Sequence, residues 1–254
     1  MTGMLDTAIE AAYTAGKLLR QNFGSPLNVN QATHHDIKLE IDEQAQQAIT
    51  KVVLADFPQH AILGEEGVSG RDDAEARWVI DPLDGTVNYF YGIPMYAVSI
   101  AAQRRVGADK WETVAGVVYA PEMDEMFAAQ RGSGPTLNSQ PIRVSGRAEL
   151  SEAIVGIGFF KSEETIRKSL VNFQYLVPRA RKMRLLGAAA LDTVYVACGR
   201  FDAYIEYGIK LWDICAGQLI LEEAGGRVDS TPAAEPHSFD VRMSNGKLKL
   251  DLPG

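Results

Sequence analysis

Hydrophobic residues near the start of the chain recur at three- and four-residue intervals, the spacing of an amphipathic helix. The first such segment covers roughly residues 5–22, and its apolar positions are Leu5, Ile9, Ala12 and Leu19. A second covers roughly residues 43–57. The pattern therefore predicts that two helices open the chain.

From Trp78 onward the pattern changes to short apolar or alternating runs bounded by turn residues, which is typical of strands. Predicted strands cover residues 78–80, 97–103, 113–119, 125–130, 153–158 and 201–206. Predicted helices in the second half cover residues 163–176, 187–198 and 212–223. Because helices and strands are mixed in both halves, we expect layered α/β packing.

Composition adds limits on partners and compartment. The 254 residues are 46% hydrophobic and 23% charged, which is enough for a substantial core, and the formal net charge of -8 opposes binding to nucleic acid or an anionic membrane. Residues 85–103 carry no charge but are too polar to span a bilayer. No secretion signal is visible, and Cys198 and Cys215 both lie in apolar stretches. A cytoplasmic protein without disulfides is expected.

The most informative segment is residues 78–88, where an apolar strand ends in two carboxylates three positions apart, Asp81 and Asp84. Pro82 restricts the backbone on both sides of it, so the turn can direct both carboxylates and the Leu83 carbonyl toward one point. Converging hard oxygen atoms suit magnesium. Two acids of this kind predict a metal site at the end of the strand.

Gly85 would let a phosphate approach the backbone, and a helical turn starting there would offer the free N–H groups of Gly85 and Thr86 to an anion. The same segment also fits a purely local interpretation. In that interpretation the Asp, Pro and Gly residues form an Asx-type turn and a helix cap.

Two further acidic positions have equally local alternatives. Glu65 and Glu66 follow the apolar run 61–64, which could be a strand end or a solvated loop. Asp213 stands where the N-cap of the helix 212–223 is expected. A capping role and a role as metal ligand are compatible for Asp213.

Three motifs together resemble the inositol monophosphatase family, in order and in spacing. They are Gly64-Glu65-Glu66, Asp81-Pro82-Leu83-Asp84-Gly85-Thr86, and Trp212-Asp213 with Ala216-Gly217. The resemblance runs nearly from end to end and implies a layered α/β/α/β/α sandwich. It implies one compact catalytic unit, with most metal ligands in the half 1–140 and with Asp213 and the specificity residues in the half 141–254.

The resemblance also implies a metal-dependent active site. Two or three magnesium ions would be held by Glu65, Asp81, the Leu83 carbonyl, Asp84 and Asp213. The ions would reverse the local negative field and so attract phosphate. Asp42 and Thr86 match the pair that orients and deprotonates the attacking water. Where the family often shows Val-Thr two to three positions before its next carboxylates, this chain reads Asp36-Ile37-Lys38-Leu39-Glu40-Ile41-Asp42. Asp42 is also a candidate helix cap before Glu43.

Substrate contacts are implied in the same way. The residues expected at the substrate are Glu65, Leu83, Asp84, Gly85, Thr86, Gly187, Ala188, Ala189, Glu206 and Asp213. The backbone of 187–189 would face the alcohol portion, and close helix packing is the alternative explanation for those residues. Glu206 would accept hydroxyl hydrogen bonds and would oppose a second phosphate.

We therefore expect an enzyme that hydrolyses a small phosphorylated polyol or sugar, with inositol monophosphate as the first candidate. The basic run 179–184 could hold the second phosphate of fructose 1,6-bisphosphate or a nucleotide, or it could be a solvated face. Histidinol phosphate and 3′-phosphonucleotides are further alternatives. A metal-binding or protein-binding module without turnover is the alternative of a different class. The family likeness also implies a homodimer and inhibition by lithium.

Overall fold

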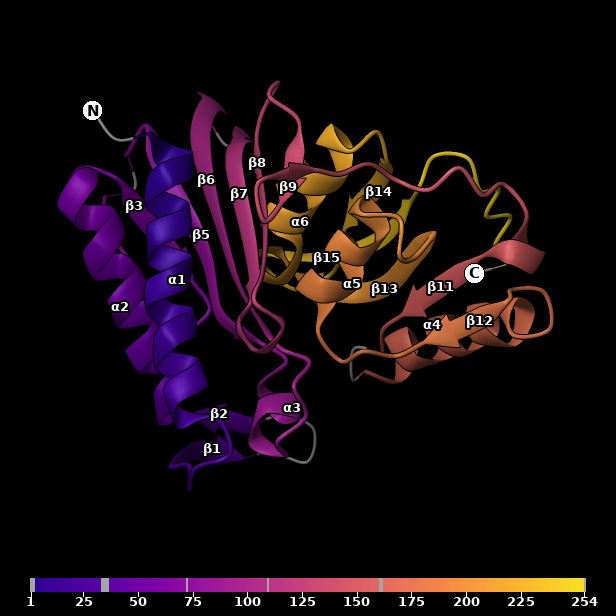
Figure 1. The fold of residues 1–254 in the computed structure, drawn as a ribbon, viewed down its shortest axis with the longest axis horizontal. Helices are drawn as coiled ribbons and strands as arrows, with labels where there is room; N and C mark the ends of the chain where they lie inside the picture. Colours follow the sequence, from indigo (N-terminus) through magenta and orange to yellow (C-terminus); the bar gives the residue numbers. More distant parts are fainter. Residues whose placement is uncertain (1–2, 33–36, 72, 109, 160–161, 254) are drawn as a thin grey trace.

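Two sheets and three helical layers alternate across the molecule (Figure 1). The computed structural model describes residues 3–32, 37–71, 73–108, 110–159 and 162–253. The helices are α1 (Met4–Asn22), α2 (Glu40–Asp56), α3 (Thr86–Phe90), α4 (Glu163–Leu176), α5 (Ala189–Ala197) and α6 (Leu211–Glu223), with 3-10 turns η1 (Pro121–Met123) and η2 (Leu150–Glu152). The layers are α1 and α2, a large sheet, α5 and α6, a smaller sheet, and α4, so the predicted α/β/α/β/α sandwich is confirmed.

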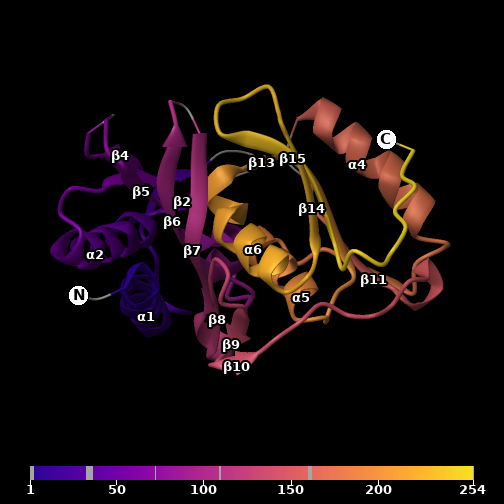
Figure 2. The ribbon, with the colours of Figure 1, turned by 90° about the horizontal axis from the view of Figure 1, so that it is seen from above.

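The large sheet has eight strands in the order β10-β9-β8-β7-β6-β5-β3-β4. Its strands are β3 (Ala61–Gly64), β4 (Gly67–Ser69), β5 (Ala76–Asp84), β6 (Ala97–Gly107), β7 (Lys110–Ala120), β8 (Glu125–Gln130), β9 (Pro135–Leu137) and β10 (Gln140–Pro141). Seen from above, α1 and α2 cover one face of this sheet and α5 and α6 cover the other (Figure 2).

The smaller sheet has five strands in the order β12-β11-β13-β15-β14. Its strands are β11 (Ile154–Ile157), β12 (Lys182–Arg184), β13 (Ala203–Lys210), β14 (Arg227–Pro232) and β15 (Ser238–Ser244). A separate antiparallel pair, β1 (Val29–Ala32) and β2 (Ile37–Leu39), precedes α2. Helix α4 packs on β13, on the far side of the smaller sheet from α5 and α6.

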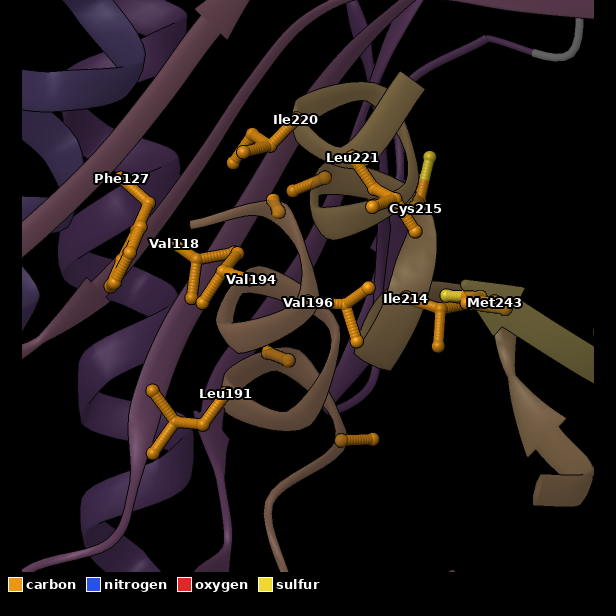
Figure 3. Packing of buried hydrophobic residues seen from close by; sticks show 14 of the residues in the cluster. Val118, Phe127, Leu191, Val194, Val196, Ile214, Cys215, Ile220, Leu221 and Met243 are labelled. Carbon is orange, nitrogen blue, oxygen red and sulfur yellow. The ribbon is translucent and has the colours of Figure 1, made fainter. Parts of the chain in front are cut away.

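Three hydrophobic clusters fill the spaces between the layers. The central cluster joins the large sheet to α5 and α6, and Figure 3 shows Val118 and Phe127 facing Leu191, Val194 and Ile220. These side chains are buried, and burying each contributes about 1.5–3 kcal/mol. This packing holds α5 and α6 against the large sheet, whose strand β5 carries the predicted ligands Asp81, Leu83 and Asp84.

Close backbone contact seats α6 on the large sheet. Gly116 in β7 has no side chain, and a Cβ atom there would lie only 2.8 Å from the carbonyl oxygen of Ala216. The hydroxyl of Ser99 in β6 donates a 3.0 Å hydrogen bond to the carbonyl of Trp212. These contacts place the first turn of α6 at the edge where β5 ends.

Two predicted N-cap residues were wrong in the same way. Helix α2 begins at Glu40, so Asp42 lies in its first turn instead of capping a helix that starts at Glu43. Helix α6 begins at Leu211, so Asp213 is its third residue and not its N-cap. In both helices the carboxylate accepts a hydrogen bond from the backbone N–H of the N-cap residue. Asp42 accepts from Leu39 at 2.7 Å, and Asp213 accepts from Lys210 at 3.1 Å. This satisfies a free N–H group from inside the helix.

Within the described ranges, no helix combines the length and the apolar character needed to cross a membrane. Cys198 and Cys215 are both free thiols, as expected.

Candidate metal centre and substrate pocket

The parallel pairing of β3 with β5 brings the first two acidic positions together. Gly64 lies opposite Ile80 in this register, and the N–H of Glu65 donates a 3.0 Å hydrogen bond to the carbonyl of Ile80. Glu65 therefore follows its strand at the level where Asp81 continues the neighbouring strand. Carboxyl ends of parallel strands meet at one edge of a sheet, where sites are commonly built.

Asp213 completes a group of three carboxylates from three distant segments. One carboxylate oxygen from each of Glu65, Asp81 and Asp213 lies within 4.8 Å of the other two. Asp81 is 1% exposed, and Glu65 and Asp213 are partly exposed. Oxygen ligands converging at a partly open edge match what a hard divalent cation requires.

Asp84 lies near this group but is held by other contacts. Its Oδ1 accepts a 3.1 Å hydrogen bond from the N–H of Ala189, and its Oδ2 accepts a 2.7 Å hydrogen bond from the N–H of Ala190. Both donors belong to the first turn of α5, whose N-terminus favours a negative charge. The N–H of Ala189, predicted to face the substrate, is thus already engaged by Asp84.

The acids repel one another in a poorly hydrated place. Burial, together with repulsion from Glu65, raises the pKa of Asp81 well above its usual range. Burial and repulsion from Glu65 raise the pKa of Asp213 likewise. For Asp84, burial outweighs the two backbone hydrogen bonds and raises the pKa to about 7. A bound divalent cation would offset this repulsion, so the residues fit magnesium.

The turn after Asp81 combines the local and the functional interpretations. The N–H of Leu83 donates a 2.9 Å hydrogen bond to Oδ1 of Asp81, which is the Asx-type turn. The hydroxyl of Thr86 donates a 3.0 Å hydrogen bond to the Leu83 carbonyl, and Gly85 has a φ of 89° that an L side chain rarely adopts. A helical turn does begin at Thr86, as expected.

Asp42 is 3% exposed, and its second oxygen, Oδ1, has no hydrogen-bond partner among the residues that the structure describes. Burial is the main cause that raises the pKa of Asp42 to about 8, with smaller contributions from Glu66 and Glu65. The pairing of Asp42 with Thr86 stays a prediction. Lys38, in the segment that departs from the family pattern, pairs with Glu66 at 3.0 Å.

A pocket of about 250 Å³ opens beside Asp84. The residues lining it include Gly187, Ala188, Ala189 and Glu206, four of the residues predicted at the substrate. The pKa of Glu206 is raised to about 7, because burial outweighs the hydrogen bond that it accepts from Tyr204. Its contact with substrate remains a prediction.

The basic run 179–184 does not reach this pocket. Arg179, Arg181, Lys182 and Arg184 are exposed and are absent from the pocket lining. Lys182 and Arg184 lie on β12, at the edge of the smaller sheet. This placement favours the solvated basic face over a site for a second phosphate.

Sequence reasoning missed two residues at this place. Asn88 donates hydrogen bonds from its amide to the carbonyls of Met95 (2.7 Å) and Leu186 (2.8 Å), which fixes the segment before α5 against α3. Asp192 lines the pocket and is 2% exposed. The sequence did contain one signal for Asp192, because it is a single acidic residue within the otherwise uncharged helix 189–197.

Comparison with known proteins agrees with this geometry. A model of the inositol monophosphatase family matches residues 1–246. A protein of Pseudomonas aeruginosa named "Nus factor SuhB" is 41% identical over 90% of this chain and 85% of its own length. The inositol-1-monophosphatase of Rhizobium meliloti is 36% identical over 89% of this chain and 84% of its own length.

Solved structures share the whole fold. The extragenic suppressor protein suhB of Bartonella henselae superposes with a TM-score of 0.86, at 32% identity, over 95% of this chain and 93% of that protein. The inositol monophosphatase of Anabaena superposes with a TM-score of 0.82, at 36% identity, over 96% of this chain and 90% of that protein.

Proposed function

Because the chain belongs to the inositol monophosphatase family, we propose that it is a magnesium-dependent hydrolase of a small phosphomonoester. The observation that carries the proposal is the meeting of Glu65, Asp81 and Asp213 within 4.8 Å of one another, although they come from three separate segments. Placing three carboxylates close together where they are partly removed from water costs free energy, because they repel one another and lose hydration. Binding of a cation between them would offset this cost.

Glu65, Asp81, Asp213, Asp84 and the Leu83 carbonyl would hold two or three magnesium ions. When bound, magnesium acidifies water and offsets the negative charge that develops on the phosphate oxygens. The carboxylate of Asp42 would accept the proton of the attacking water, and the Thr86 hydroxyl would orient that water. Both halves of the chain contribute ligands, so 1–140 and 141–254 would act as one catalytic unit.

The phosphate group would lie among Glu65, Gly85, Thr86 and Asp213, near the free N–H groups that follow Asp84. The alcohol portion would extend into the pocket beside Asp84, along the backbone of 187–189 and toward Glu206. A carboxylate at that place accepts from hydroxyl groups and repels a second phosphate. Inositol monophosphate is therefore the first candidate substrate, ahead of fructose 1,6-bisphosphate, histidinol phosphate and 3′-phosphonucleotides.

A phosphate-release panel tests the proposal. Purified protein is assayed on inositol 1-phosphate, fructose 1,6-bisphosphate, histidinol phosphate and 3′-phosphoadenosine 5′-phosphate, with magnesium, with a chelator, and with added lithium. We expect release that requires magnesium, is fastest for inositol 1-phosphate and is inhibited by lithium. Absence of release from all four substrates would contradict an enzymatic role.

A second candidate function comes from the names of similar proteins. Four relatives of 39% to 41% identity are named "Nus factor SuhB" and not as phosphatases, so a metal-binding or protein-binding module without turnover is the alternative to an enzyme. Magnesium binding without turnover on any substrate of the panel would support this alternative.

On the family likeness we further propose a cytoplasmic homodimer. Sedimentation equilibrium of the purified protein tests the dimer, and a mass equal to one chain at all concentrations would contradict it.

A further inference from the structure

The pocket beside Asp84 contains a carboxyl group that the proposed reaction does not use. Asp192 lies on α5, is 2% exposed and lines the pocket together with Tyr204 and Glu206. Its Oδ1 atom has no hydrogen-bond partner in the described part of the chain. A buried polar atom without a partner is destabilising and calls for an explanation.

Strand β11 and the residue that follows it make room for this carboxyl group and for that of Glu206. Gly156 lies in β11, and Gly158 comes directly after the strand ends at Ile157. A Cβ atom on Gly156 would lie 2.5 Å from Oδ1 of Asp192, and one on Gly158 would overlap the carboxyl group of Glu206. The two acids therefore lie side by side against backbone without side chains.

The neighbouring donors do not satisfy Asp192. The Tyr204 hydroxyl donates to Oε2 of Glu206, and the first free N–H groups of α5 are taken by Asp84. No lysine or arginine lines the pocket among the described residues. Oδ1 of Asp192 is therefore a buried acceptor without a donor among the described residues. A donor carried by the ligand would supply what the protein lacks.

We propose that Asp192 is a specificity-determining residue that accepts a hydrogen bond from a hydroxyl group of the substrate's alcohol portion. The neighbouring hydroxyl group of the same substrate would donate its hydrogen bond to Glu206. This inference rests on the proposed function. Two acceptors on one wall suit a polyol with neighbouring hydroxyl groups and discriminate against an alkyl or aryl phosphate. The gain comes from pairing a buried acceptor that is otherwise left unpaired.

The test compares two substrates in each of three proteins at saturating magnesium. The proteins are the wild type, Asp192→Ala and the control Thr193→Val, which removes a buried hydroxyl of α5 that contacts Ala189 and does not line the pocket. The substrates are inositol 1-phosphate and p-nitrophenyl phosphate, whose leaving group has no hydroxyl donor beyond the ester. The quantity measured is the ratio of their kcat/KM values.

We expect Asp192→Ala to lower this ratio roughly 2- to 10-fold, the range for losing one hydrogen bond between uncharged groups, mainly through KM for inositol 1-phosphate. Thr193→Val should leave the ratio at the wild-type value. An unchanged ratio in Asp192→Ala would overturn the inference, whether both activities fall together or neither changes. If Asp192→Ala does not fold, Asp192→Asn gives the same comparison, with a smaller fall expected because its amide oxygen still accepts.

Three further outcomes are informative when histidinol phosphate is added as a third substrate. If histidinol phosphate loses more than inositol 1-phosphate in Asp192→Ala, the residue recognises an ammonium group, which overturns the hydroxyl assignment. If the wild type releases phosphate from none of the three substrates, the proposed function fails and the inference fails with it. Release from p-nitrophenyl phosphate alone would leave the hydrolase standing and would overturn the inference about polyol recognition.

Discussion

The backbone N–H of Ala190 donates a 2.7 Å hydrogen bond to Oδ2 of Asp84, although the two residues lie 106 positions apart in the sequence. Asp84 ends a strand of the large sheet and Ala190 lies in the first turn of α5, in the layer that joins the two sheets. The contact couples the position of a predicted metal ligand to the helix that borders the substrate pocket.

This contact makes Asp84→Asn a sharp test. Both carboxylate oxygens accept from N–H groups, so an amide would place its own NH₂ group against one of those donors. We expect magnesium-dependent phosphate release to fall at least about 100-fold. Mutating a residue that merely holds a metal ligand in place already costs up to about 100-fold in activity, and loss of the ligand itself should cost no less. The free energy of unfolding should fall by about 1–3 kcal/mol. Asp229→Asn, on the exposed strand β14, is the matched control and should keep wild-type activity.

The crowded acids predict how stability depends on pH in metal-free protein. The pKa of Asp84 is raised from 3.8 to about 7 and that of Asp42 from 3.8 to about 8, so the folded state holds more protons than the unfolded state between these values. The contribution of these two groups to the free energy of unfolding is therefore fully present below about pH 4, and it is lost as the pH rises toward 8. Thermal unfolding in a chelator should show a lower Tm at about pH 8 than at about pH 5.

Saturating magnesium should reduce that pH dependence, because a cation that binds only the folded state stabilises it most where the carboxylates are ionised. If magnesium raised the Tm equally at both pH values, the acidic cluster would not be the site where it binds.

The seating of α6 on the large sheet gives a prediction that links packing to function. Gly116→Ala would push a methyl group against the backbone of Ala216 and should destabilise the protein by about 1–3 kcal/mol. Because α6 carries Asp213, the variant should also bind Mn²⁺ more weakly in calorimetry. Gly146→Ala meets no atom within 4 Å and is the control, expected to change neither quantity. Equal stability of the two variants would show that the close contact is not needed.

Lys38 gives a prediction about metal affinity. Its ammonium group pairs with both oxygens of Glu66, the neighbour of Glu65. Removing this positive charge with Lys38→Met leaves the acidic group more negative, so the magnesium concentration for half-maximal activity should fall, by less than about tenfold because Lys38 is partly exposed. A higher magnesium requirement in this variant would mean instead that the pair serves to position Glu65.

The sequence predicted the elements whose patterns are strong and local. The strand at Trp78, the turn that follows it and the two helices that open the chain were all visible as periodicity and turn residues. The fold itself followed from the family resemblance of three motifs. Helix starts were less predictable, because Leu39 and Lys210 occupy the N-cap positions without a capping side chain. A carboxylate at the third helical position does the capping instead, and the sequence alone does not distinguish it from an N-cap.

The site shows a similar limit. Glu65, Asp81 and Asp213 could be named from motifs, but their convergence depends on the parallel pairing of β3 with β5 and on the seating of α6, both long-range contacts. Asp192 was missed because a single acid in an apolar helix does not indicate which side chains it faces. Its place beside Glu206 becomes apparent only once Gly156 in β11 and Gly158 just after that strand pack against the two carboxyl groups.

The central claim is that Glu65, Asp81 and Asp213 together hold divalent metal. Anomalous diffraction from crystals soaked in Mn²⁺ measures this directly. The account predicts an anomalous peak within coordination distance of a carboxylate oxygen from each of these three residues, and its loss in Asp213→Ala crystals. Strong peaks only at other acidic residues, in crystals of protein that hydrolyses its substrate, would contradict it.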